Sequence, residues 1–119
     1  MNIRRDIYYM MPEGWWRAFG DRMVDDIENE VKTWPPERQK EFKVIDVKEK
    51  WGKLVTYVTI ETNEIDRIID YYEKLSTKTC IRCGRPAVWI SKGWISPFCD
   101  ECARKNEHFD KHFIKIEED

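Results

Sequence analysis

The sequence contains no long apolar run and lacks the common catalytic motifs. No stretch approaches the ~18 consecutive apolar residues of a membrane-spanning helix. The G-x-S-x-G, phosphate-binding-loop and G-x-G-x-x-G motifs are all missing. The only histidines are His108 and His112, whose spacing can seat a metal ion on a helix, but no glutamate completes H-E-x-x-H. These absences argue against an enzyme, and we expect two solvated helical histidines.

The sequence has no large excess of charge of either sign and no recognisable secretory signal peptide. The net charge of −2 places no global demand for nucleic acid or an acidic membrane as a partner. The first residues have no apolar signal region or cleavage site, so we expect a cytoplasmic protein. Its length of 119 residues, 41% of them hydrophobic, favours either one compact domain or one domain with a small appended module.

Hydrophobic periodicity predicts two helices around a β-hairpin in residues 1–77. Apolar residues recur at helical spacing in two segments, and β-branched and aromatic residues fill two segments on either side of Gly52. Pro35-Pro36 ends the first helix, and Asn63 is the expected N-cap of the second. The predicted elements of this αββα unit are a helix at 13–34, strands at 42–50 and 53–61, and a helix at 64–76.

All four cysteines lie in the remaining segment, 78–119, as C-x2-C-x15-C-x2-C. This spacing is a strong signal for zinc, because two residues between thiolates allow both to bind one ion. A reducing cytosol also favours metal over disulfides. Gly84 provides the permissive backbone dihedral that such a turn often needs. The predicted ligands are Cys80, Cys83, Cys99 and Cys102. Four thiolates leave no open coordination position, so we expect a structural Zn²⁺ and no catalysis.

The residues between and after the cysteines indicate how the module folds. Two short β-like runs flank Lys92-Gly93 and predict a hairpin, and the sequence after Cys99 has helical character to residue 117. A turn, a hairpin and a C-terminal helix that carries the second cysteine pair form a treble-clef-like plan. A zinc ribbon, which ends in a second hairpin, is the alternative. The predicted fold class is therefore α+β, with an αββα unit followed by this zinc module.

Charge is segregated along the chain, which identifies two candidate partner surfaces. The cysteine segment is basic with interspersed tryptophans, a mixture that can bind a nucleic-acid backbone and stack a base, or can be an ordinary solvated module. Residues 21–30 are acidic and can bind a basic protein groove or be a solvated helix face. The candidate partner-binding residues are Arg82, Arg85, Trp89, Lys92, Trp94 and Arg104 in the basic set, and Asp21, Asp25 and Glu28 in the acidic set.

Five short pieces, in order, carry a resemblance to a known group of proteins. They are Gly14-Trp15-Trp16, VKEKWG at 47–52, TCIRCG at 79–84, Gly93-Trp94 and FCDEC at 98–102. Together the set resembles small, mostly uncharacterised zinc-binding proteins of bacteriophages and prophages. In those relatives the last ligand is often histidine, where this chain has Cys102. The exchange of cysteine for histidine is one that a metal ligand tolerates.

The resemblance implies a function that composition and spacing do not show. Small phage proteins without catalytic residues are often inhibitors of host defence, and some anti-CRISPR proteins that block Cas9 contain zinc. We therefore expect a non-enzymatic, phage-encoded inhibitor of a Cas9-type nuclease that impedes target-DNA loading in the host cytosol. The alternatives are a regulatory zinc protein that binds nucleic acid directly, and a structural or adaptor protein of the phage.

Overall fold

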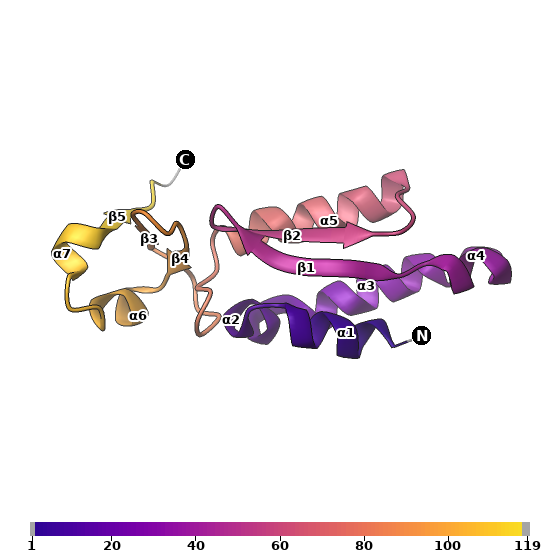
Figure 1. The fold of residues 1–119 in the computed structure, drawn as a ribbon, viewed down its shortest axis with the longest axis horizontal. Helices are drawn as coiled ribbons and strands as arrows, with labels where there is room; N and C mark the ends of the chain where they lie inside the picture. The colour runs from indigo at the N-terminus through magenta and orange to yellow at the C-terminus, as the bar shows by residue number, and fades with distance from the viewer. Residues whose placement is uncertain (1, 118–119) are drawn as a thin grey trace.

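The computed structural model describes residues 2–117, which form an elongated molecule of 53 × 28 × 21 Å (Figure 1). We call residues 2–77 the N-terminal unit and residues 78–117 the cysteine module; they occupy opposite ends of the long axis. The helices and strands of the N-terminal unit are α1 (Ile3–Met10), α2 (Glu13–Trp15), the π-helical segment η1 (Trp16–Gly20), α3 (Asp21–Val31), α4 (Pro36–Glu41), β1 (Val44–Lys50), β2 (Lys53–Val58) and α5 (Asn63–Ser76).

The predicted helix at 13–34 is present as the consecutive segments α2, η1 and α3, and it ends at Val31. Its predicted apolar face is confirmed, because Phe19, Met23 and Ile27 are buried. The π-helical segment brings the indole of Trp16 against Gly20, where a Cβ atom would lie 2.1 Å from Cε3 of the ring. Only glycine fits at this position without displacing Trp16.

The predicted hairpin is also confirmed. Strands β1 and β2 are antiparallel, and the pair Lys50 and Lys53 closes a two-residue turn at Trp51-Gly52. Both turn residues have positive φ angles, 56° and 83°. Two positive φ angles match a type I′ turn, whose twist fits that of the flanking strands.

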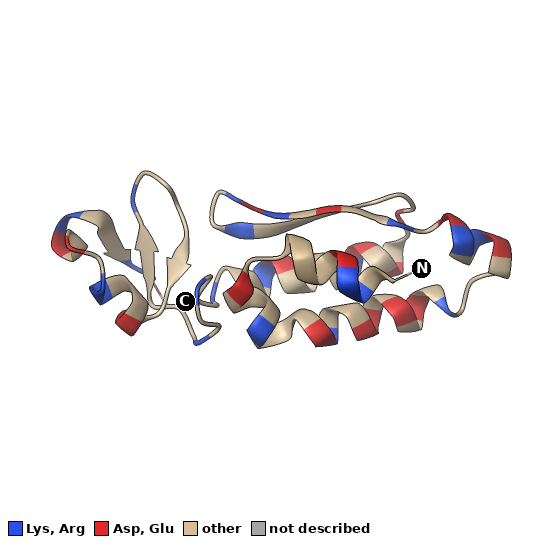
Figure 2. Ribbon diagram, turned by 60° about the horizontal axis from the view of Figure 1, so that its bottom comes forward, with Lys and Arg blue, Asp and Glu red and all other residues tan. Residues whose placement is uncertain are grey.

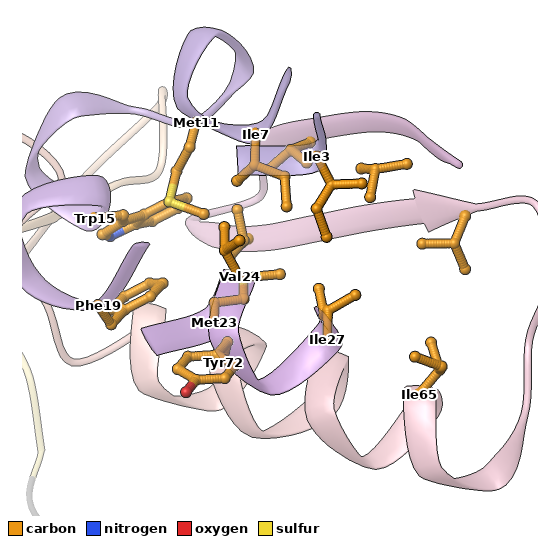
Figure 3. Close-up of a cluster of buried hydrophobic side chains, with 14 of the residues drawn as sticks. Ile3, Ile7, Met11, Trp15, Phe19, Met23, Val24, Ile27, Ile65 and Tyr72 are labelled. Carbon is orange, nitrogen blue, oxygen red and sulfur yellow. The ribbon is translucent and has the colours of Figure 1, made fainter. Parts of the chain in front are cut away.

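The core lies between this two-stranded sheet and the helices α1, α3 and α5 (Figure 3). Helix α1 was not predicted from the sequence, yet it buries Ile3 and Ile7 against the sheet. Helix α5 ends at Ser76 as predicted, but it begins one residue earlier than predicted, at Asn63, and its N-cap is Thr62 rather than Asn63. The Thr62 hydroxyl accepts a hydrogen bond from the Ile65 amide at 3.1 Å, which satisfies one of the unpaired donors of the first turn.

The cysteine module contains a small sheet and two short helices. Its elements are β3 (Trp89–Ser91), β4 (Pro97–Phe98), α6 (Asp100–Arg104), α7 (Phe109–His112) and β5 (Phe113–Lys115). The predicted hairpin at Lys92-Gly93 is confirmed by β3 and β4, and the sheet order is β4-β3-β5. The described part of the module ends at residue 117, so the last two residues of the predicted module lie outside it.

The prediction of one C-terminal helix was wrong. Helix α6 ends at Arg104, and the chain then reverses so that β5 pairs with β3. The aromatic residues that suggested a continuous helical face instead pack on the hairpin. The ring centroids of Phe109 and Trp89 are 4.9 Å apart, and those of Phe113 and Phe98 are 5.6 Å apart. None of the helices within residues 2–117 has the length and hydropathy needed to cross a membrane.

Candidate metal centre

The four cysteine sulfurs converge on one point in the cysteine module. All four Sγ atoms lie within 4.8 Å of one another, and none of the cysteines is in a disulfide. The Sγ atoms of Cys83 and Cys99 are 3.5 Å apart. A tetrahedral zinc site with Zn–S bonds of about 2.3 Å holds its sulfurs about 3.8 Å apart. The arrangement therefore fits a metal ion coordinated by four thiolates.

Each cysteine pair is positioned by a different local structure. The first pair sits in a tight turn in which the Gly84 amide donates to the Cys80 carbonyl at 3.0 Å. Gly84 has a φ of 87°, which confirms the predicted need for a permissive residue there. In the second pair, Cys99 is the N-cap of α6, and its sulfur accepts a hydrogen bond from the Cys102 amide at 3.3 Å. Backbone structure thus fixes both pairs.

The electrostatics of the cluster favour a bound cation. Burial raises the pKa of the Cys80 thiol, but backbone amides that donate to its sulfur outweigh this and lower it to about 7. Burial and the neighbouring sulfurs raise the pKa of Cys102 to about 12 and also raise that of Cys83. Four thiols this close do not ionise together unaided, whereas a cation at their centre stabilises all the thiolates.

The site is anchored to the N-terminal unit through close backbone contacts. The Gly14 amide donates to the Ile81 carbonyl at 2.9 Å, and the buried indole of Trp15 donates to the Thr79 carbonyl at 3.0 Å. A Cβ atom on Gly14 would lie 2.3 Å from the Cys80 carbonyl oxygen, and one on Gly84 would lie 2.7 Å from that of Gly14. Two glycines therefore allow α2 and the first cysteine turn to pack backbone against backbone.

The basic residues predicted to bind a partner are in large part paired within the module. Arg85 forms an ion pair with Glu101, and Arg104 bonds to both oxygens of Asp100 at 2.9 Å. The Trp89 indole donates to Asp100 at 2.9 Å, and this bond and the guanidinium of Arg104 lower the pKa of the Asp100 carboxyl. Arg85 and Arg104 are nevertheless exposed. Arg82, Lys92 and Trp94 are also exposed, and within residues 2–117 their side chains form no ion pair or hydrogen bond.

The acidic residues predicted to bind a partner lie together on α3, but all three form ion pairs with one arginine of α1. Arg4 forms ion pairs with Asp21 at 2.6 Å, Asp25 at 2.5 Å and Glu28 at 3.3 Å. Figure 2 shows acidic residues distributed along α3. The three carboxylates and one guanidinium leave a net charge of −2, so the acidic character of this face is reduced and not abolished.

One feature of the surface was not recognised from the sequence. Trp51, at the tip of the β1–β2 hairpin, is exposed and lies beside the turn that contains Trp94. Gly52 allowed the turn itself to be predicted. The exposure of Trp51 could not be predicted, because it depends on how the β1–β2 and β3–β4 hairpins lie relative to each other. His108 and His112 have ring centroids 5.4 Å apart, and within residues 2–117 the four cysteines form the sole cluster with metal-ligand geometry.

Comparison of the chain with protein-family models, curated proteins and solved structures gave no match. The function proposed below therefore rests on the geometry of the site, on the residues around it and on the resemblance of the sequence pieces described above.

Proposed function

We propose that the four cysteines bind one structural Zn²⁺ ion and that the chain is a non-enzymatic binding protein. The observation that carries this proposal is the convergence of four sulfurs within 4.8 Å. Four thiolates complete the tetrahedral shell of zinc and leave no position for a reacting water or substrate. The ion would fix the shape of a module that has little hydrophobic core of its own.

A treble-clef-like plan for this module is part of the proposal. Three elements support it: a first cysteine turn, the β3–β4 hairpin, and a second cysteine pair at the start of α6. A zinc ribbon would instead carry its second pair on another hairpin. The helical setting of Cys102 favours the treble-clef-like arrangement.

We further propose that the partner is a Cas9-type nuclease and that the chain is a phage-encoded inhibitor of target-DNA loading. The identity of the partner rests on the resemblance described above. The acidic surface of α3 supports the mechanism, because such nucleases hold nucleic acid in positively charged channels that an acidic surface complements. Asp21 and Asp25, both exposed, are the residues through which this complementarity would act.

The test is a titration of labelled duplex target DNA into a Cas9–guide complex, with and without the protein. We expect the protein to reduce loading and the double variant Asp21→Asn/Asp25→Asn to reduce it less. Glu37→Gln, an exposed acid on α4, is the matched control and should inhibit like the wild type. Undiminished loading at saturating protein would contradict the proposed partner, while zinc content, measured separately, tests the metal site.

A further inference from the structure

Two exposed tryptophans lie on neighbouring turns where the N-terminal unit meets the cysteine module. Trp51 is 72% exposed at the β1–β2 turn, and Trp94 is 80% exposed at the β3–β4 turn. The turns contact each other, since a Cβ atom on Gly52 would lie 3.0 Å from Cγ2 of Ile95. Between them is an open hollow of about 240 Å³, lined by Glu49, Lys50, Trp51, Gly93, Trp94 and Ile95.

The backbone of Trp51 is unfavourable for a residue of its type. Its φ of 56° lies in the left-handed region, where a bulky side chain is an outlier. The first position of a type I′ turn strongly favours asparagine or aspartate, which adopt this conformation readily. Trp51 also gains little from burial because it is exposed. Neither the local conformation nor the packing of the fold explains a tryptophan here, which indicates a role in binding.

The charges around the two tryptophans are predominantly positive. Lys50, Lys53 and Lys92 are exposed beside the two turn tips. Glu49 is the single acidic residue that lines the hollow, and its carboxylate already accepts a hydrogen bond from the Gly52 amide at 2.7 Å. The surface thus offers two aromatic faces with cationic side chains on both turns.

We infer that this surface, formed by Trp51 and Trp94 with Lys50, Lys53 and Lys92, binds single-stranded nucleic acid. Unpaired bases stack on the indole rings, and the lysines contact the phosphates. Duplex nucleic acid is a poor ligand because its bases already stack on one another. The hollow is smaller than the ~300–1,000 Å³ of pockets that enclose small molecules, so an extended polymer fits it better. This inference does not rest on the proposed inhibition of a nuclease.

The test is fluorescence anisotropy of a labelled oligothymidylate titrated with the full chain, with no nuclease present. We expect binding at low salt, with a log–log salt slope of about −2 for three phosphate contacts on a single strand. Lys92→Gln should reduce the magnitude of this slope by about 0.7. The duplex of the same length should bind at least about tenfold more weakly, because it has no unpaired base to stack.

Two tryptophan variants separate binding from folding. Trp51→Asn should keep or raise the melting temperature, because asparagine suits the left-handed turn, yet weaken binding about tenfold through the loss of one stacked base. Trp94→Ala should weaken it by a similar factor. Tyr9→Ala is the matched control, because Tyr9 is also 72% exposed but lies on α1. This variant should bind the oligothymidylate with the affinity of the wild type.

Three results would overturn the inference. The first is the absence of binding to single strands at low salt. The second is equal binding by the wild type, Trp51→Asn and Trp94→Ala. The third is a concentration-dependent dimer in sedimentation that both variants dissociate, because the tryptophans would then form an interface between two copies of the chain. In each case the outcome is independent of whether the protein impedes DNA loading by a nuclease.

Discussion

The N-terminal unit and the cysteine module bury very different kinds of side chain. Every buried member of the hydrophobic cluster lies between Ile3 and Tyr72. In the cysteine module, the buried hydrophobic side chains are Cys80, Cys99 and Ala103, together with Pro97. The first region has the core of a small domain, and the second is organised around its sulfur atoms and a few partly buried aromatic pairs.

This difference implies that the two regions depend on different sources of stability. Burial of large aliphatic and aromatic side chains stabilises the N-terminal unit by the hydrophobic effect. The module is too small to gain comparable stability from its own core, so a metal ion is the expected substitute. Conditions that remove metal should then separate the two regions, while conditions that weaken the hydrophobic effect should affect mainly the first.

The largest expected effect comes from removing one ligand. Cys80→Ser should abolish metal binding and unfold the module while the N-terminal unit keeps its structure, because structural zinc contributes roughly 10–16 kcal/mol of apparent binding free energy. Metal content and residue-resolved amide exchange would measure this. Arg82→Ser, in the same turn, is the control and should retain the metal. A wild-type protein that is fully folded without metal would contradict the assignment.

An intermediate effect is expected at the junction between the regions. Gly14→Ala places a Cβ atom 2.3 Å from the Cys80 carbonyl oxygen, so the backbones of α2 and the first cysteine turn must separate. We expect a loss of about 1–3 kcal/mol in the free energy of unfolding, the usual range for overpacking. Urea denaturation followed by tryptophan fluorescence would measure it.

The matched control for the junction is Glu13→Ala, because Glu13 is the exposed neighbour of Gly14. It should lose only the weak ion pair with Arg17. If Gly14→Ala unfolds like Glu13→Ala, the two regions do not depend on each other at this contact. The zinc affinity of Gly14→Ala is a second test of the junction. We expect a weaker affinity than that of the wild type, because the substitution displaces Cys80.

The sequence predicted best those features that depend on neighbours along the chain. The apolar face containing Met23 and Ile27 follows from helical periodicity, and the cysteine spacing identifies all four sulfurs of the cluster. Glycines at tight turns were equally predictable, because Gly52, Gly84 and Gly93 all adopt positive φ angles. In each case the physical cause lies within a few residues.

Features that depend on distant contacts were not predictable in this way. Phe109 and Phe113 have helical spacing, but their rings pack against Trp89 and Phe98 of the hairpin, and the chain bends accordingly. Helix α1 has only eight residues, too few to give a clear periodic signal. Ion pairs between residues far apart in the sequence, such as Arg85 and Glu101, were also not predictable. The number of charges in the cysteine module was counted correctly from the sequence, but not which of them neutralise one another.

The smallest expected effect tests the hydrophobic region by itself. The buried Tyr72 hydroxyl donates a hydrogen bond to the Asp26 carboxylate. Burial raises the pKa of Tyr72, and the bond to Asp26 raises it further above the ordinary value of 10. Tyr72→Phe should lower the free energy of unfolding at neutral pH by about 1 kcal/mol, the typical net contribution of one hydrogen bond. The metal content should be unchanged.

The raised pKa of Tyr72 also predicts how stability depends on pH. The folded state holds the phenolic proton more tightly than the unfolded state, so the stability from this group is complete below pH 10 and is lost as the pH rises above it. Urea denaturation at a series of alkaline pH values should therefore show a shallower decline for Tyr72→Phe than for the wild type. Parallel curves for the wild type and Tyr72→Phe would show that the phenolic proton of Tyr72 is not held more tightly in the folded protein than in the unfolded chain.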